Sequence, residues 1–441
     1  MRKHLLFILF GCLLFSCRKQ VDEDLYQQQH LVKKTDSPEF NKLYGGSSED
    51  YLGTVIPGNT GGFVIIGETY SSDGDVEVNK DMGDIWIVKV DEAGKKIWQK
   101  TYGGSNFERA ISIAPCVGGY LVVGRMYSTD GDIPAIHGDG DGFVLSIDEN
   151  GNLVNQKTFG GSDFDEITAI LPDGNGNYIL AGGTNSIDNG LNTNHGGGDI
   201  WVIKIDAQLN MLWQKDLGGS DFDAINAATV GKDGSCIVTG FTASNDGDVK
   251  YNHGEVDFWV VKLSANGGII WEKTYGGTGS DLASSITGSV DGGYLVAGLT
   301  TSSDGDVTVR KGGFVDAWMI KVDKEGGVKW DKTVGGSGFE QCTFSTTTHN
   351  GDFLVGGVST GNDGDFAANK GLSDGWIMRL DKQGHEKWIK VTGGSSYDRV
   401  IAACAGPLGN LVIGGTTNSN DGDVTGNHGG SDFWLFTIKD K

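Results

Sequence analysis

The sequence predicts an all-β protein: a seven-bladed β-propeller built from four-stranded blades. Glycine makes up 73 of the 441 residues, well above the roughly 7% of ordinary proteins, and so much glycine disfavours helices. A glycine pair followed by Ser or Thr recurs at intervals of 57 to 59 residues, beginning at Gly45, Gly103, Gly160, Gly218, Gly276, Gly335 and Gly393, which indicates a repeat architecture. Each repeat contains four short apolar segments between Gly- and Asp-rich turns, as a four-stranded blade requires.

The unit that begins at Gly276 shows the expected elements in order. Its four predicted strands are 283–287, 294–298, 316–321 and 330–333, and the turns between them are 291–293, 304–306 and 323–326. The turns are rich in Asp and Gly, which favour tight reversals of the chain. The same order of elements recurs in the other units, so we expect seven similar blades.

The two ends of the chain predict how the ring closes. The seventh unit ends near Ile438 and lacks a fourth strand. Residues 40–44 precede the first glycine pair and align with the fourth strand of the first unit, 98–102. We therefore expect residues 40–44 to complete the last blade, which removes an open sheet edge. The propeller domain is predicted to span 39–441.

The N-terminus has the pattern of an export signal. Arg2 and Lys3 precede an apolar run over 5–15 that is too short to span a membrane. Residues 14–17, Leu-Phe-Ser-Cys, resemble the lipobox of bacterial lipoproteins, in which the cysteine becomes the first residue and is acylated, for example with palmitate. The alternative is an ordinary cleaved signal with an incidental cysteine at Cys17.

This resemblance implies a division of the chain before the propeller. Residues 1–16 would be the signal peptide, and 17–38 the acylated Cys17 with a polar, flexible tether. The acidic cluster at 22–24 resembles the export tag that sends some Gram-negative lipoproteins to the cell exterior, although any charged tether looks similar. We expect a lipid-anchored protein of the bacterial outer membrane that faces outward.

The net charge and the positions of the cysteines bear on two questions: whether the protein binds nucleic acid and whether it forms disulfide bonds. The net charge of −23 repels phosphate backbones, so we expect no nucleic-acid partner. The cysteines beyond Cys17 fall at different positions in different repeats, which favours unpaired core residues over disulfides; they are Cys116, Cys236, Cys342 and Cys404.

Tryptophan and histidine follow the repeat, which favours structural roles for both. Every Trp occupies one of two repeat positions, in the third or the fourth strand. One loop position carries His or Lys in different units, and a position that accepts Lys is a poor metal ligand. Its occupants are His137, His195, His253 and His428, and Lys80, Lys311 and Lys370.

Two segments resemble known propeller repeats. Residues 91–98 resemble the repeat of quinoprotein-type propellers, and 291–298 with 304–306 resemble glycine-rich propeller repeats of lipoproteins exported by Gram-negative bacteria. The resemblance covers 39–438 and implies a fold rather than an activity. A quinone dehydrogenase is disfavoured, because such enzymes usually have eight blades and a vicinal cysteine pair, and this sequence has neither.

Catalytic motifs are absent from the sequence. It has no His-Glu-x-x-His and no Walker loop, so we assign no catalytic residue. The pattern favours a non-enzymatic binding or scaffold propeller for a protein or glycan partner. The alternative is a propeller hydrolase or lyase that acts on polysaccharide, since carboxylate pairs are abundant.

Acidic residues recur in the loops that a propeller gathers on one face. An Asp-Gly-Asp turn follows the second strand, and a further Asp begins the third; the third unit departs from this pattern after Asp188. These acids either cap turns or hold one Ca²⁺ per blade, since calcium takes six to eight oxygen ligands. The candidate calcium ligands are Asp73, Asp75, Asp84, Asp130, Asp132, Asp141, Asp246, Asp248, Asp257, Asp304, Asp306, Asp316, Asp363, Asp365, Asp374, Asp421, Asp423 and Asp432.

Positions where the repeats disagree predict a ligand site. Tyr and Arg, which are frequent in binding hot spots, replace the small or polar residues of other units at the start of the first strand and the end of the second. These residues are Tyr51, Tyr70, Arg109, Arg125, Tyr127 and Arg399. Because units seven, one and two adjoin in a closed ring, we expect one sector that binds an acidic glycan or an acidic protein loop. The alternative is neutral drift at exposed positions.

Overall fold

The computed structural model describes residues 39–439, except 81, 134–135, 189, 191–194, 232 and 407–408. The chain divides into two units between Pro38 and Glu39. The predicted signal peptide, the lipidation site at Cys17 and the tether therefore lie outside the described residues. No helix among the described residues has the length and apolar character of a membrane-spanning segment.

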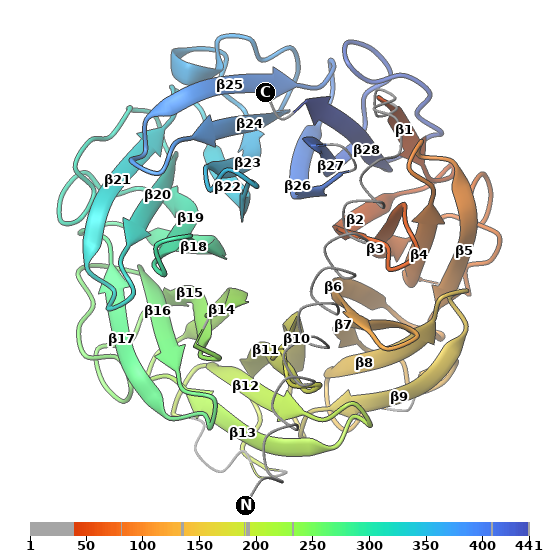
Figure 1. Cartoon of the computed structure of the whole chain (residues 1–441), viewed down its shortest axis with the longest axis horizontal. Helices are drawn as coiled ribbons and strands as arrows, with labels where there is room; N and C mark the ends of the chain where they lie inside the picture. The colour runs from red at the N-terminus through yellow and green to blue at the C-terminus, as the bar shows by residue number, and fades with distance from the viewer. Residues whose placement is uncertain are drawn as a thin grey trace, which may run out of the picture. The chain divides into compact units, whose positions relative to one another are not determined.

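Seven four-stranded antiparallel sheets form a ring, which confirms the predicted fold class (Figure 1). Blade one contains β2 (Asp50–Pro57), β3 (Phe63–Thr69), β4 (Asp84–Val90) and β5 (Lys96–Tyr102); blade two contains β6 (Glu108–Cys116), β7 (Gly119–Met126), β8 (Asp141–Asp148) and β9 (Leu153–Phe159); blade three contains β10 (Asp165–Pro172), β11 (Tyr178–Thr184), β12 (Asp199–Ile205) and β13 (Met211–Leu217). Within each blade the strands pair in chain order, from the inner strand beside the ring centre to the outer strand at the rim.

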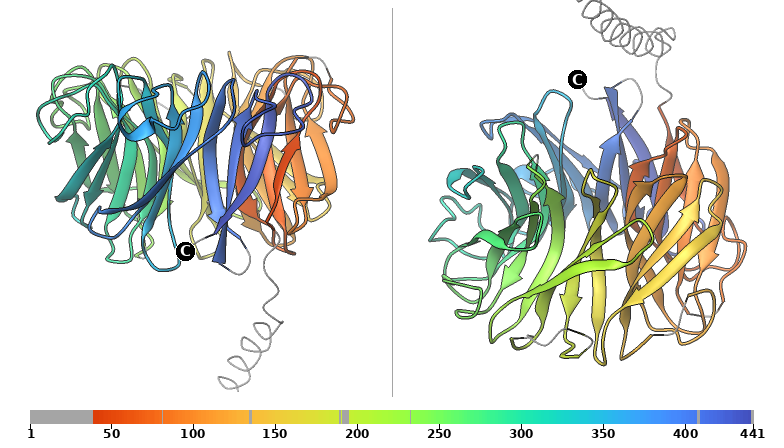
Figure 2. Two further views of the ribbon diagram at one scale, coloured as in Figure 1. Left: turned by 90° about the horizontal axis from the view of Figure 1, so that it is seen from above. Right: turned by 60° about the horizontal axis from the view of Figure 1, so that its bottom comes forward.

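The remaining blades follow the same plan. Blade four contains β14 (Asp223–Val230), β15 (Cys236–Thr242), β16 (Asp257–Leu263) and β17 (Ile269–Tyr275); blade five contains β18 (Asp281–Gly288), β19 (Tyr294–Thr300), β20 (Asp316–Val322) and β21 (Val328–Val334); blade six contains β22 (Glu340–Thr347), β23 (Phe353–Ser359), the 3₁₀ turn η1 (Gly364–Phe366), β24 (Asp374–Leu380) and β25 (Glu386–Thr392); blade seven contains β26 (Asp398–Ala405), β27 (Asn410–Thr417), β28 (Asp432–Lys439) and β1 (Asn41–Tyr44). The strands run across the thickness of the ring, between two faces formed by loops (Figure 2).

The N-terminal strand completes blade seven, as predicted. β1 pairs antiparallel with β28, with Leu43 opposite Trp434. The Phe40 N–H donates to Thr437 Oγ1 at 3.0 Å, and the Thr437 N–H donates to the Phe40 carbonyl at 3.0 Å. The buried Phe40 ring joins the hydrophobic cluster between blades seven and one. The two ends of the described chain are thus fastened in one sheet.

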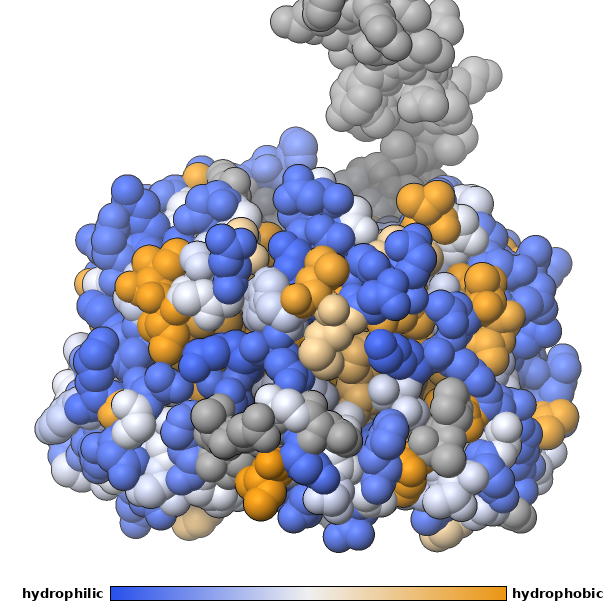
Figure 3. All heavy atoms as spheres, turned by 90° about the horizontal axis from the view of Figure 1, so that it is seen from below, coloured by the Kyte–Doolittle hydropathy of each residue, from blue (hydrophilic) through white to orange (hydrophobic). Residues whose placement is uncertain are grey.

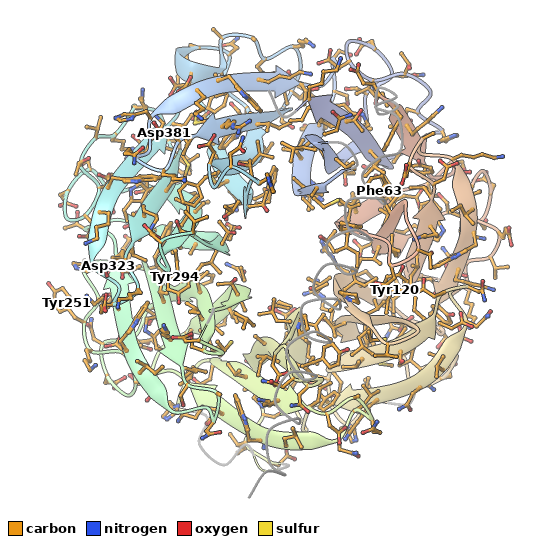
Figure 4. The ribbon with its side chains drawn as sticks, in the orientation of Figure 1. Phe63, Tyr120, Tyr251, Tyr294, Asp323 and Asp381 are labelled. Carbon is orange, nitrogen blue, oxygen red and sulfur yellow. The ribbon has the colours of Figure 1, made fainter. Side chains whose placement is uncertain are left out.

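Apolar side chains fill the space between neighbouring blades. Phe63, labelled in Figure 4, belongs to the cluster shared by blades seven and one, and Tyr120 to the cluster shared by blades one and two. The third-strand tryptophans are buried, whereas three fourth-strand indoles reach the next blade: Trp98, Trp271 and Trp330 donate to the carbonyls of Glu149, Lys324 and Lys382 at 3.0 to 3.2 Å. Both Trp positions therefore hold blades together.

The four cysteines of the described chain are free thiols, which confirms the prediction that they are unpaired. Cys236 and Cys342 are buried, and Cys116 and Cys404 are half-buried against the core. Burial raises the pKa of the Cys236 thiol to about 12. These thiols fill space in the core.

Candidate ligand-binding site

Each inner strand begins with an acid on one face of the ring, which we call the loop face. Its backbone N–H donates to a carbonyl of the preceding blade at 2.6 to 3.1 Å. Its carboxylate accepts the N–H of the second glycine of the pair at 2.7 to 3.0 Å in all seven blades. These buried acids are Asp50, Glu108, Asp165, Asp223, Asp281, Glu340 and Asp398. They join one blade to the next.

The first Asp of each Asp-Gly-Asp turn caps the glycine-pair loop. Its Oδ1 accepts the backbone N–H of the Ser or Thr after the glycine pair at 2.7 to 2.9 Å in every blade, including blade three through Asp188. This backbone hydrogen bond lowers the pKa of Asp73, Asp246, Asp304 and Asp363. The capping role thus persists where the third unit departs from the sequence pattern.

The second Asp of the turn pairs with lysines in several blades. The Lys96 ammonium lies 2.7 Å from Asp75, and the Lys370 ammonium lies 2.7 Å from Asp423. The Lys80 ammonium also pairs with Asp132. These contacts cross between strands or blades, so the turn acids stabilise the loop face through charge as well as through hydrogen bonds.

The Asp that begins each third strand accepts the backbone N–H of the His or Lys loop position at 2.6 to 2.9 Å. In four blades the imidazole Nδ1 also contacts the same carboxylate, at 2.5 to 2.9 Å. Protein donors therefore engage many of the predicted calcium ligands. Calcium binding stays a prediction, and a titration is described below.

The other carboxylate oxygen of this Asp explains the glycine signature. Oδ1 is buried without a hydrogen-bond partner in Asp141, Asp199, Asp257, Asp316, Asp374 and Asp432. It lies against the first glycine of the pair, where a Cβ would stand less than 3.0 Å away. A Cβ on the second glycine would meet the capping Asp equally closely, as Gly161 shows beside Asp188. Both glycines are required because carboxylates occupy the space of a side chain.

The structure brings the six predicted ligand-site residues into one region of the loop face, which we call the Arg-Tyr sector. Its members are Tyr51, Tyr70, Arg109, Arg125, Tyr127 and Arg399. The three arginines act on the buried Glu68 of β3 and oppose the burial that raises its pKa. The closest of these pairs joins Arg109 Nε to Glu68 Oε2 at 3.8 Å. Blades seven, one and two meet there, as predicted.

The other two arginines of the Arg-Tyr sector differ in whether an acid lies within salt-bridge distance. Arg125 Nη1 lies 3.2 Å from Glu166 Oε2 in blade three. Arg399 is exposed to solvent, and no described acid lies within the 4.0 Å of a salt bridge. Desolvation by the surrounding protein and the positive charge of Arg109 lower the pKa of Arg399. These arginines face Glu68 and Glu166, and Glu49 makes a side-chain hydrogen bond with Tyr51, so three basic and three acidic side chains meet in this part of a strongly acidic protein.

An aromatic row borders these arginines and extends over blades one to three. The ring centroids lie 6.4 Å apart for Tyr51 and Tyr70, 6.4 Å for Tyr70 and Phe107, 6.0 Å for Phe107 and Tyr127, and 6.1 Å for Tyr127 and Phe164. The Arg125 guanidinium lies 5.8 Å from the Phe107 centroid, within cation–π range. One side of the ring, by contrast, shows hydrophobic residues separated by hydrophilic ones (Figure 3).

Sequence reasoning missed Glu68 and the two phenylalanines of the row. Glu68 was detectable, because the other blades carry Arg125, Gly183, Phe241, Leu299, Val358 and Thr416 at the same place in the second strand. No other blade has an acid there. Phe107 and Phe164 directly precede the acid that begins an inner strand. This position is aromatic in five of the seven units, so these two residues follow the repeat and could have been found from it: Phe107, Phe164, Phe222, Phe339 and Tyr397.

Comparisons with known proteins add little to this geometry. No protein-family model matches the chain. The chain is similar to the regulatory protein FlaEY of Caulobacter vibrioides, with 27% identity over 183 residues. That match covers 39% of this chain and 19% of FlaEY, so the chain spans about a fifth of this relative.

Three solved structures are similar at low identity. Sqt1 from Chaetomium thermophilum has a TM-score of 0.47 at 10% identity, over 91% of this chain and 100% of that one. The Pan2 WD40 domain of Neurospora crassa has a TM-score of 0.46 at 9% identity, over 90% and 98%. A protein of unknown function from Bacteroides caccae has a TM-score of 0.36 at 13% identity, over 70% and 90%.

Proposed function

We propose that this chain is a non-enzymatic binding propeller whose Arg-Tyr sector holds a protein or glycan partner that presents carboxylates. The proposal rests on one observation: Arg109, Arg125 and Arg399 converge on Glu68 beside a row of aromatic rings. Guanidinium groups bind carboxylates through paired hydrogen bonds, and tyrosines stack on sugars or apolar side chains. The site thus favours an acidic glycan or an acidic protein loop.

Arg399 is the residue that most favours an incoming anion. Part of its side chain is exposed to solvent, while desolvation by the surrounding protein and then the nearby positive charge of Arg109 lower its pKa and so disfavour its charged form. A ligand carboxylate would relieve that repulsion. Nucleic acid is a poor candidate, because the net charge of −23 repels an extended phosphate backbone.

We also propose that acylated Cys17 holds the propeller on the outer membrane, facing the cell exterior. The lipobox-like residues 14–17 and the acidic tether support this proposal. A sector that binds carboxylate-bearing polymers would then meet extracellular glycans or proteins directly.

The binding experiment compares variants of the Arg-Tyr sector. The triple variant Tyr51→Ala, Arg109→Ala, Arg399→Ala is expected to lose binding on an array of uronic-acid and neutral glycans, and in pull-downs. The matched control is Tyr251→Ala, Lys324→Ala, which removes an exposed aromatic and an exposed cation away from the sector. Equal binding by the triple variant and the control would remove the sector from consideration.

A polysaccharide-cleaving enzyme is the second candidate, because Glu68 breaks the repeat pattern beside the same arginines. Burial raises its pKa, as a general acid requires. Glu68→Gln would abolish the release of reducing ends from an acidic polysaccharide if this candidate is correct. Binding without such release, in both the wild type and the variant, would exclude it.

A further inference from the structure

Blade three differs from the other blades in one residue of its outer strand. Asp216 of β13 pairs with Trp201, at a position where other blades carry Thr101, Thr158, Thr274, Thr333, Val391 and Leu43. No other blade places an acid there. Asp216 is buried, so at this position a carboxylate has left bulk water in blade three only.

Asp216 lies beside a histidine and a second buried acid. One ligand atom from each of His195, Asp199 and Asp216 lies within 4.8 Å of the other two, and no comparable group of three occurs elsewhere in the described chain. Asp199 Oδ2 accepts the His195 backbone N–H at 2.8 Å and contacts the ring Nδ1 at 2.9 Å. This contact orients the imidazole, whose side chain is 31% exposed and leaves a path from solvent.

The second carboxylate oxygen of Asp199 makes no hydrogen bond. Asp199 Oδ1 is buried without a hydrogen-bond partner, and it is directed at Gly218, two residues beyond Asp216 on the same stretch of chain. A buried carboxylate oxygen without a donor is costly. In blade three the Asp199 carboxylate has both an imidazole and a further carboxylate nearby, and the three groups together can surround a cation.

We propose that His195, Asp199 and Asp216 form a binding site for one transition-metal dication, of which Zn²⁺ is the representative. One imidazole nitrogen and two carboxylates suit zinc, with water in the remaining positions, whereas calcium prefers oxygen ligands alone. Bonds of about 2.0 to 2.2 Å would draw the three ligand atoms together from their present separations. The dication would also neutralise the two neighbouring buried carboxylates.

The other blades show why no sequence pattern indicates this site. His137, His253 and His428 make the same contact with the Asp that begins their third strand. Those blades lack an acid at the place of Asp216, although His253 Nε2 also lies 4.0 Å from Asp306 Oδ2. That this loop position is a poor metal ligand stays a prediction for those blades, and Asp216 makes blade three the exception.

The test uses the full chain, stripped of metal with a chelator and titrated with ZnCl₂ by calorimetry. We expect one high-affinity site in the wild type and a loss of affinity of at least about tenfold in Asp216→Thr. Threonine occupies this position in four other blades, so the variant is expected to fold, and its melting temperature without metal checks that. Co²⁺ in place of zinc should give a visible absorption band that Asp216→Thr abolishes.

The matched experiment tests whether a second zinc site can be introduced into another blade. Thr158→Asp places an acid in blade two, where His137 and Asp141 already make the equivalent contact at 2.6 Å. We expect this variant to bind two zinc ions. The proposal is overturned if wild-type protein binds no zinc, if Asp216→Thr binds as tightly as the wild type, or if Thr158→Asp folds yet gains no site, since the three side chains would then not suffice.

Discussion

Asp141 Oδ1 occupies the space that a side chain on Gly160 would need. A Cβ at Gly160 would stand less than 3.0 Å from this oxygen. Asp141 begins β8 and Gly160 follows the neighbouring strand β9, and the pairing of Gly142 with Phe159 places them side by side. The same relationship recurs around the ring, from Asp432 at Gly45 to Asp374 at Gly393. The first glycine of each pair is therefore required by a contact with the buried Asp that begins the third strand, and this contact recurs in all seven blades.

Gly160→Ala is expected to lower the free energy of unfolding by about 1 to 3 kcal/mol, because the new methyl group forces the buried Asp141 carboxylate to move. Urea denaturation measures the change. Gly288→Ala is the matched control, since a Cβ there meets nothing within 4 Å and should cost little. Equal destabilisation by both substitutions would contradict the explanation.

Asp374 makes the stability depend on pH. Burial and the nearby charge of Asp398 raise the pKa of Asp374 to about 6 in the folded chain, above its unfolded value of about 3.9. The unfolded chain therefore loses this proton first, and stability falls as pH rises between about 4 and 6.

Asp374→Asn keeps an oxygen that accepts the Lys370 N–H and removes the charge. Relative to the wild type, it should gain on the order of 1 to 2 kcal/mol of unfolding free energy between pH 4 and pH 7. Denaturation curves at both values measure this. A difference between the two proteins that does not change with pH would show that Asp374 does not titrate in this range.

Ring closure depends on Phe40, which precedes the β1 strand. Phe40→Ala removes a buried ring that lies 6.2 Å from Phe63, and we expect a loss of about 3 kcal/mol of unfolding free energy. Ile97→Ala, on the exposed side of blade one, serves as the control and should change little. A Phe40→Ala melting temperature equal to that of the control would mean that strand exchange contributes little.

The calcium hypothesis makes a separate prediction about the loop face. If the Asp-Gly-Asp turns hold calcium, millimolar calcium should raise the melting temperature of chelated protein, because a ligand of the folded state stabilises it. Calorimetry would show heat at up to one ion per blade. Absence of both signals would leave the turn acids as caps.

The sequence predicts that acylated Cys17 anchors the protein to a membrane. Cys17→Ala should release the protein from membranes, and fractionation of cells after a carbonate wash measures the release. Cys404→Ala, which changes a half-buried free thiol, is the control and should leave the membrane fraction unchanged. A Cys17→Ala protein that stays membrane-bound would contradict lipidation at this residue.

The sequence by itself determined the number of blades, the order of their strands and the exchange of the N-terminal strand. These features follow from local patterns that repeat every 57 to 59 residues. The strands that pair in each blade are neighbours in the chain, except for β28 and β1 in blade seven. The six residues of the Arg-Tyr sector were also predictable, because they depart from a repeat whose geometry was already evident.

Only the tertiary structure decided what those residues meet. Glu68 and Arg399 are neighbours because closure of the ring brings blade seven beside blade one, and no local pattern records such a contact. Asp199 and Asp216 likewise come together through the pairing of β12 with β13, and Asp216 replaces a threonine that a sequence pattern treats as variation. The physical reason is that charge and burial depend on distance in space, whereas a repeat records only distance along the chain.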